Sequence, residues 1–393
     1  MWLTFGGEFR ARFESLDSVD FGVADGPDYS VVAQRGLLHA DLRTETGPRF
    51  FVQLSAAEQS GREPGARSFD ESGPDLAQAF LDLPVRFEGG SLSLRVGRQE
   101  LNLDNRLVAL RDGVTLRRAF DGARLDLAAG GFAMTGFFVR PILNRPGAFD
   151  DRTTPGETFG GVSVALPHAD GGPIWSIFAF ERRRRLARFA SAIGEERRQS
   201  YGFRYAADEA ASDLEVQVVA QRGEVGDQAV AAWGMAVDYG WRPSPRSPTR
   251  IGIELSAASG DGDPDDGELN TFDPLYPNLG AFGDAPLYYY ANQINAQINA
   301  QRRFGAVTLQ ADVTLTGRYD TADAIYVSPG RPLATPPPDN RFSAVVLEAS
   351  ARWSVRPGVE LYAAILRAEA LDAIRDVGGD DISFGLVQLS AAF

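Results

Sequence analysis

Three patterns in this chain of 393 residues predict an all-β fold, a transmembrane antiparallel β-barrel of about 18 strands. Apolar and polar residues alternate over segments of about ten residues, the length of a tilted strand in a membrane. Short and long connections alternate between these segments. The last segment ends on an aromatic residue, Phe393, as the final strand of such a barrel commonly does.

The first strand is expected at the amino terminus, where the side chains alternate with a period of two. The apolar face holds Leu3, Phe5, Phe9, Ala11 and Phe13, and the polar face holds Thr4, Glu8, Arg10, Arg12 and Glu14. The same period recurs over residues 35–43 and 307–316. In a membrane barrel the apolar face contacts lipid and the other face lines the lumen.

Residues 294–301, INAQINAQ, separate the two faces most clearly. Every even position is Ile or Ala, and every odd position is Asn or Gln. A soluble sandwich or barrel would bury the Asn and Gln face in a dry core without enough hydrogen-bond partners. A barrel with lipid outside and water inside suits both faces, so the membrane barrel is favoured.

The connections add a second, independent pattern. The short ones, placed after even-numbered strands, are TETGP, EGGS, AGG, PHADGG, ADEAAS, RPSPRSP, FGAV and RPG. The long ones follow odd-numbered strands and include 14–30, 59–75, 100–119, 259–287 and 319–340, with one short exception at GEVGDQ. Outer-membrane barrels have short periplasmic turns and longer extracellular loops.

Aromatic residues mark the expected periplasmic rim. Trp2, Trp175, Trp241 and Trp353 all lie close to predicted short turns, where an interfacial girdle is expected. No domain boundary interrupts the pattern, so residues 1–393 are expected to form one outer-membrane domain. The amino terminus lacks the charged and apolar regions of a signal peptide, which we expect to have been removed from an exported chain.

Composition excludes several classes of function. The net charge is −14, so non-specific binding to nucleic acid is not expected. All 39 basic residues are arginine, so every positive side chain is a permanently charged guanidinium group. No window approaches 18 consecutive apolar residues, which excludes a membrane helix. The chain has no cysteine and only His39 and His168, so thiolate chemistry and the usual zinc sites are excluded and no cofactor is expected. An outer-membrane enzyme stays open as an alternative, although neither histidine has an evident serine partner.

A calcium-dependent surface receptor is a second alternative. Asp261, Asp263 and Asp265 have the alternate spacing of a calcium-binding loop. Gly267 stands one position late, however, and no glutamate follows at the required distance. A solvated acidic extracellular loop is therefore the favoured interpretation.

The stretch IWSIFAFERRRRLARF, residues 174–189, carries four consecutive arginines. The alternation of short and long connections, which we call loop parity, predicts that this stretch ends at the extracellular end of an odd-numbered strand. The arginines there are Arg182, Arg183, Arg184 and Arg185. Arginines that point outward there would bind lipid phosphates, and those that point inward would line the mouth. A solvated loop root is an equal alternative. The facing of each arginine is left open because both faces of the preceding segment are apolar.

Four motifs carry a resemblance to a known family. They are QAFLDL at 78–83, LRVGRQELNLDNRLVALRDG at 94–113, RRAFDGARLDL at 117–127 and SGDGDPDDGELNTFDPLYPNLG at 259–280. In these motifs the chain resembles the alginate-export family of outer-membrane porins. The resemblance implies a monomeric 18-stranded barrel that passes an anionic polysaccharide through an arginine-lined constriction. By position it implies roles for Arg95, Arg98, Arg106, Arg117, Arg118 and Arg124.

Together these observations predict an outer-membrane porin, not an enzyme, for passive passage of an anionic saccharide or another small acidic solute. Residues 100–119 are the candidate for a loop folded into the pore, where Arg95, Arg106, Arg111 and Arg124 would converge. The expected pore-lining residues are Arg10, Arg12, Arg35, Arg43, Arg95, Arg98, Arg106, Arg111, Arg117, Arg124, Arg204 and Arg352. The expected partners are outer-membrane lipid, lipopolysaccharide and the saccharide.

The form of the electric field in the lumen is left open. Carboxylates that are expected to face the lumen lie among the arginines, at Glu8, Asp41, Asp126, Glu254 and Glu348. A transverse field and a uniformly positive ring are both compatible with this pattern.

Overall fold

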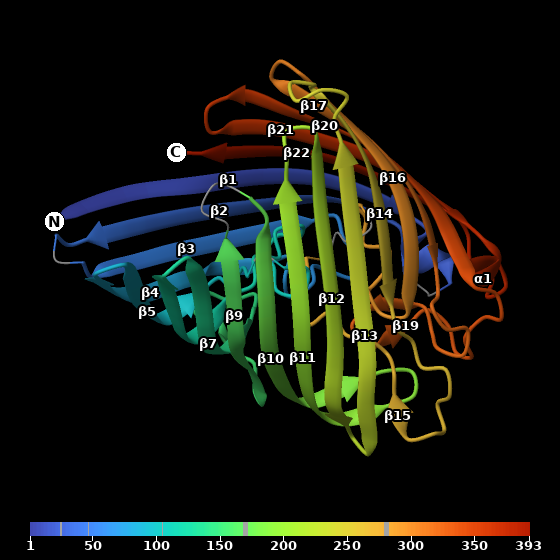
Figure 1. The fold of residues 1–393 in the computed structure, drawn as a ribbon. Coiled ribbons are helices and arrows are strands. Elements are labelled where there is room, and N and C mark those ends of the chain that lie inside the picture. Colours follow the sequence, from blue (N-terminus) through green and yellow to red (C-terminus); the bar gives the residue numbers. More distant parts are fainter. Residues whose placement is uncertain (24–25, 46, 104, 168–171, 279–282) are drawn as a thin grey trace.

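The computed structural model describes residues 1–23, 26–45, 47–103, 105–167, 172–278 and 283–393. In these ranges the chain forms a closed antiparallel barrel of 18 long strands, as the alternation predicted (Figure 1). The first strand pairs with the last in a register that runs from Glu8–Ala392 to Asp17–Ser383, and this pairing closes the barrel. Closure leaves no unpaired sheet edge in the membrane.

The barrel strands are β1 (Trp2–Asp17), β2 (Tyr29–Arg43), β3 (Arg49–Ser60), β4 (Ser72–Phe87), β5 (Gly90–Gln99), β6 (Phe120–Ala129), β7 (Phe132–Leu143), β9 (Glu157–Pro167), β10 (Ile174–Arg188), β11 (Ile193–Asp208), β12 (Ser212–Val225), β13 (Gln228–Trp241), β14 (Thr249–Ala258), β16 (Gln293–Phe304), β17 (Val307–Gly317), β20 (Phe342–Arg356), β21 (Val359–Ala370) and β22 (Ile382–Ala392). The loops contain β8 (Arg152–Thr153), β15 (Glu268–Leu269), β18 (Tyr326–Ser328), β19 (Arg331–Pro332), the 3-10 turn η1 (Val19–Gly22) and the helix α1 (Asp372–Arg375). No helix in the described ranges is long and apolar enough to cross a membrane.

The predicted loop parity is confirmed with one correction. Turns such as 88–89 and 357–358 close one end of the barrel, and long segments such as 100–119 and 318–341 emerge at the other. The sequence predicted a single short connection at the long-loop end, and the structure has two. Besides 226–227, residues 189–192 join β10 to β11 tightly, because the Phe189 N–H donates a hydrogen bond to the Ala192 carbonyl at 2.8 Å.

Alternation sorts the side chains of β1 as expected. Leu3, Phe5 and Phe9 are exposed on the outer face, whereas Arg10 and Arg12 are buried on the inner face. The four tryptophans near the short turns, Trp2, Trp175, Trp241 and Trp353, are each about half exposed. A ring of half-exposed indoles at this rim fits the interface between lipid tails and water.

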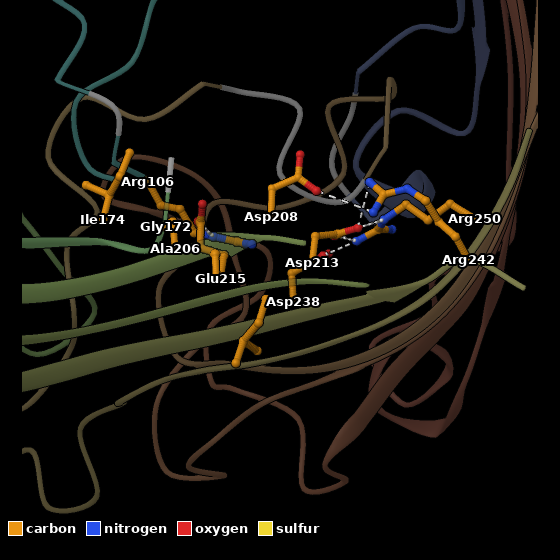
Figure 2. Close-up of a pocket in the computed structure, with 12 residues that line it drawn as sticks. Arg106, Gly172, Ile174, Ala206, Asp208, Asp213, Glu215, Asp238, Arg242 and Arg250 are labelled. Carbon is orange, nitrogen blue, oxygen red and sulfur yellow. Dashed lines mark hydrogen bonds and ion pairs between the residues drawn. The ribbon is translucent and has the colours of Figure 1, made fainter. Parts of the chain in front are cut away.

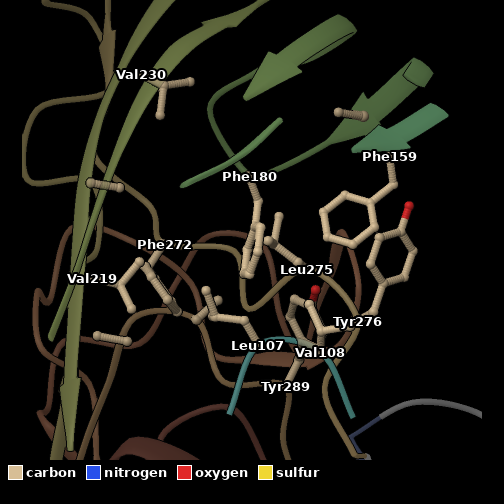
Figure 3. Packing of buried hydrophobic residues seen from close by; sticks show 14 of the residues in the cluster. Leu107, Val108, Phe159, Phe180, Val219, Val230, Phe272, Leu275, Tyr276 and Tyr289 are labelled. Atoms are coloured by element: carbon tan, nitrogen blue, oxygen red, sulfur yellow. The ribbon is translucent and has the colours of Figure 1, made fainter. Parts of the chain in front are cut away.

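The inner face is less polar at the long-loop end than the alternation suggested. Phe178 and Phe180 of β10 and Phe159 of β9 are buried and face inward. They pack with Leu107 from loop 100–119 and Tyr276 from loop 259–292 (Figure 3). Both faces of IWSIFAF are apolar for this reason: the outer face contacts lipid, and the inner face packs on loops that fold into the barrel.

Candidate functional site

One arm of loop 100–119 is fixed to the inner wall by ion pairs with Asp112. Arg35 of β2 donates to the Asp112 Oδ1 atom at 2.8 Å, and Arg117 donates to the same atom at 2.8 Å. Arg10 of β1 donates to the Asp112 carbonyl at 2.6 Å. Glu8 accepts from both Arg35 and Arg117. Three of the arginines predicted to line the pore therefore surround one loop carboxylate.

This contact changes the acid strength of Asp112. Burial opposes ionisation of its carboxyl group, but the hydrogen bond from Arg117 and the charge of Arg35 outweigh burial and lower the pKa to about 2. The carboxylate is therefore charged at neutral pH and holds its arginines strongly.

The other arm of the loop reaches a different part of the wall. Arg106 donates to Glu254 of β14 at 2.6 Å and to Glu215 of β12 at 3.5 Å. Its backbone N–H donates to Gln217 at 3.2 Å. Burial lowers the pKa of Arg106, but Glu254 outweighs this effect and raises it above the ordinary value. Loop 100–119 thus bridges the lumen from β1 and β2 to β12 and β14.

Arg106 lines a cavity of about 590 Å³ near the short-turn end (Figure 2). Arg242 and Arg250 lie at the other end of it, where both form ion pairs with Asp213, at 3.1 Å and 2.5 Å. Asp208 adds a further pair with Arg242 at 3.3 Å. The charges around this cavity therefore largely compensate each other.

Most of the other arginines predicted to line the pore also have a carboxylate partner. The pairs are Arg12–Glu14, Arg43–Asp41, Arg95–Asp82, Arg98–Asp121, Arg124–Asp126, Arg204–Glu215 and Arg352–Glu360. Arg95 and Arg124 are neighbours across β5 and β6, whereas Arg106 and Arg111 line two different cavities. The structure thus distributes these arginines over several parts of the lumen, and their role as pore-lining residues stays a prediction.

A second cavity, of about 730 Å³, extends along β1, β17 and β20. Three arginines in its lining have neutral partners. Arg62 donates to Gln59 at 2.8 Å, Arg111 donates to the Leu116 carbonyl and to Asn144, and Arg118 lies 5.1 Å from the centre of the Tyr276 ring. The same cavity is lined by Asp284, Asp312 and Glu348. The lining also holds Arg12, Arg67 and Arg331 with Glu14, Asp20 and Asp70, of which Arg12, Arg67 and Arg331 form ion pairs with Glu14, Asp70 and Asp20. The arginines with neutral partners and the carboxylates of β17 and β20 therefore come from different elements.

The four consecutive arginines lie within β10 and alternate in direction. Arg182 is 2 % exposed and faces inward, and Arg184 is also largely buried there. Arg183 is 57 % exposed and lies opposite Arg197 of β11, which is 50 % exposed, and both pair with Glu181. A bulge after Arg184 shifts the register, and Arg185 is exposed. The structure thus gives the direction of each arginine, inward for Arg182 and Arg184 and outward for Arg183, while the lipid contact of the outward ones stays a prediction.

The inward pair fixes a second long loop. Arg182 binds both carboxylate oxygens of Asp273 in loop 259–292, at 3.1 Å and 2.7 Å. Arg184 approaches the same carboxylate at 3.1 Å, and Glu196 of β11 bridges Arg182, Arg184 and Arg198. Sequence reasoning missed this network. The alternation of Glu196 and Arg198 in GEERRQ points inward, but no periodic signal identifies Asp273 as their partner.

The three aspartates of the calcium hypothesis do not share one site in the described ranges. Asp261 is buried and accepts a hydrogen bond from Ser191, whereas Asp263 and Asp265 are exposed. A group of carboxylates that is compact enough for a metal ion lies elsewhere, at Asp75, Asp150 and Asp151. There Asp75 accepts hydrogen bonds from the backbone N–H groups of Asp150 and Asp151 at 2.8 Å and 3.0 Å. These hydrogen bonds account for the short distances between the three carboxylates.

The histidine of the enzyme hypothesis has an aromatic partner. His39 stacks on Phe51 with 5.4 Å between ring centres. His168, the other histidine, lies outside the described residues.

Comparisons with known proteins agree with this architecture. The porin OccK11 (OpdR) of Pseudomonas aeruginosa shares 14 % identity over 100 % of this chain and 96 % of its own, with a TM-score of 0.63. A BenF-like porin from Pseudomonas fluorescens Pf-5 shares 11 % identity over 100 % and 98 %, with a TM-score of 0.70. OccK2 (OpdF) of Pseudomonas aeruginosa, solved in complex with glucuronate, shares 12 % identity over 100 % and 96 %, with a TM-score of 0.66.

At these identities the likeness concerns the fold, which is that of outer-membrane porins. A search of curated proteins finds no match. The family model described as alginate export matches residues 1–348. Since this match includes most of the barrel, the chain is a member of the alginate export family and has the architecture of an outer-membrane porin.

Proposed function

We propose that this protein resides in the bacterial outer membrane and lets small acidic solutes, such as a uronate-bearing saccharide, pass without chemical change. Family membership and the glucuronate bound by OccK2 both favour a carboxylate-bearing saccharide. The observation that carries the proposal is the set of cavity arginines with neutral partners, Arg62, Arg111 and Arg118. Their positive charge is available to a solute, because no carboxylate in the described part of the chain forms an ion pair with them.

These three arginines are better placed to select anions than the paired ones. In a pair such as Arg95–Asp82, the carboxylate cancels much of the field of the guanidinium group beyond a few ångströms. An arginine with neutral partners acts over a longer range, and low-dielectric walls focus its field on the narrow path. Selectivity should therefore depend on Arg62, Arg111 and Arg118 more than on the total charge of the lumen.

The reversal potential in a salt gradient across a planar bilayer tests this proposal. Wild-type protein should conduct anions in preference to cations. The double variant Arg62→Gln and Arg111→Gln should shift the reversal potential toward cation preference, because it removes two unneutralised positive charges. Exposed arginines at the short turns serve as a matched control: Arg303→Gln with Arg356→Gln should change the reversal potential much less.

Folding of each variant is checked by heat-modifiable gel mobility. An unchanged reversal potential in a correctly folded Arg62→Gln and Arg111→Gln variant would contradict this assignment of selectivity. A folded wild-type protein that never forms a conducting path, even after loop 100–119 is shortened, would contradict the channel function itself.

We also propose a lipid partner for the outward arginines of β10 and β11. Arg183 and Arg197 lie side by side on the outer face at the long-loop end, with Arg185 beyond them. Guanidinium groups bind phosphate oxygens in a bidentate manner, and this rim would meet the phosphate groups of lipopolysaccharide. Arg183→Gln with Arg197→Gln should lower the amount of lipopolysaccharide that co-purifies with the barrel.

An outward arginine at the opposite rim provides the control for lipid binding. Arg302 is exposed at the short-turn end of β16, so Arg302→Gln should leave the retained lipopolysaccharide unchanged. Equal retention by the wild type and the Arg183→Gln and Arg197→Gln variant would exclude this lipid site.

A further inference from the structure

The 730 Å³ cavity has a charge distribution that a purely anionic solute does not match. Its positive part comes from the β3–β4 connection, which carries Arg62, and from loop 100–119, which carries Arg111 and Arg118. The Nη1 atom of Arg118 is buried and, among the described residues, has no hydrogen-bond partner. This part of the cavity therefore offers donors to a carboxylate.

The negative part comes from different elements. Asp312 of β17 and Glu348 of β20 are register partners on neighbouring strands. Asp284 joins them, because its backbone N–H donates to Glu348 at 3.0 Å. The other partners of these carboxylates are uncharged: Gln310 donates to Asp312 at 3.0 Å, and the Tyr362 hydroxyl donates to Asp284.

No described arginine lies within the 4.0 Å ion-pair distance of Asp284, Asp312 or Glu348. Carboxylates such as Asp112 and Asp82, by contrast, hold arginines directly. Three neighbouring carboxylates without a cation repel each other and favour the approach of a positive group.

We propose that the acidic solute of this channel also carries an ammonium group. Its carboxylate binds the part of the cavity formed by Arg62, Arg111 and Arg118, and its ammonium group binds the part formed by Asp284, Asp312 and Glu348. The inference rests on the proposed function and narrows its substrate class to amino acids and amino-sugar acids. A cavity of about 730 Å³ accommodates a solute of this size.

Three kinds of solute would interact differently with this cavity. A plain carboxylate is attracted by the arginines and repelled by the acidic part of the same cavity. A plain amine is attracted by the carboxylates and repelled by the arginines. A solute with both groups gains attraction at both parts, and burial away from bulk water strengthens each contact.

Four solutes with one sugar skeleton separate these cases in a liposome-swelling assay: glucose, glucuronate, glucosamine and 2-amino-2-deoxyglucuronate. The amino acid sugar, 2-amino-2-deoxyglucuronate, should enter wild-type proteoliposomes about threefold to tenfold faster than glucuronate, the range expected for one ion contact in a partly screened site. The variant Asp312→Asn with Glu348→Gln should abolish this advantage while glucuronate enters at an equal or higher rate. Asp263→Asn with Asp265→Asn, at exposed loop positions, should preserve the advantage.

The outcomes distinguish the two proposals. If glucuronate enters wild-type vesicles as fast as 2-amino-2-deoxyglucuronate, or if the Asp312→Asn and Glu348→Gln variant slows both equally, the ammonium site is wrong while the channel stands. If no solute enters and no conductance is measured, the channel function is wrong and the inference fails with it. Should that double variant not fold, Asp284→Asn in loop 259–292 tests the same loss of preference.

Discussion

Asp273 shows how one loop carboxylate organises several arginines. Its carboxylate accepts hydrogen bonds from Arg182 and Arg184 and also one from the Tyr289 hydroxyl at 3.0 Å. Burial opposes ionisation, but the charges of Arg182 and Arg184 outweigh it and hold the pKa of Asp273 well below the ordinary range. Stability from this group is therefore fully present at neutral pH and is lost only in strong acid, as the pH falls through the lowered pKa.

Removal of that carboxylate leaves buried positive charge without enough compensation. Asp273→Asn should destabilise the packing of loop 259–292 by about 3–5 kcal/mol, the usual cost of breaking a buried ion pair from one side. The expected result is earlier proteolysis of the loop and higher single-channel conductance, with the barrel still resistant to detergent. Asp263→Asn, at an exposed position of the same loop, should behave as the wild type, and equal protease resistance of the two variants would contradict the anchoring role.

At the scale of elements, loop 100–119 is held at two places, by Asp112 on β1 and β2 and by Arg106 on β12 and β14. The Asp112 anchor has a defined dependence on pH. The folded pKa of about 2 lies below the ordinary value of 3.8, so the anchor is complete above about pH 4 and is lost as the pH falls toward 2.

Single-channel conductance as a function of pH tests this anchor. Wild-type conductance should stay steady from pH 7 to about pH 4 and then rise as protonated Asp112 releases the loop. Asp112→Asn should show the raised conductance already at pH 7. Its curve should also lack the part of the acid transition that belongs to Asp112. Identical curves for the two proteins would show that Asp112 does not hold the loop in the conducting path.

At the scale of the whole molecule, closure depends on the pairing of β1 with β22, which is reinforced by hydrogen bonds between Gly7 and Phe393 at 3.0 Å and 3.1 Å. Deletion of residues 384–393 would leave β1 and β21 with unpaired backbone groups in lipid. We expect no heat-modifiable barrel from that variant. Phe393→Ala keeps the backbone pairing and should still form one, so loss of the barrel in both variants would assign closure to the side chain instead.

The sequence by itself determined the barrel, because the cause of the pattern is local. Lipid on one side and water on the other impose a period of two on each strand, as in INAQINAQ at 294–301 and in β1, where Phe9 and Arg10 face opposite sides. The same alternation turns Arg95 and Arg124 toward the lumen, where both side chains are largely buried. The lengths of the connections, also local, predicted the parity of the loops. These features need no knowledge of where distant residues lie.

Only the tertiary structure decided which arginines keep their charge available. Arg35 meets Asp112, and Arg182 meets Asp273, across separations of 77 and 91 residues, and both carboxylates lie in loops without periodicity. Whether an arginine has a carboxylate partner depends on the path of such a loop through the lumen, which alternation in the strands does not determine. The division of one cavity into the arginines of loop 100–119 and the carboxylates of β17 and β20 arises in the same way, because closure of the barrel brings together elements that are distant in the chain.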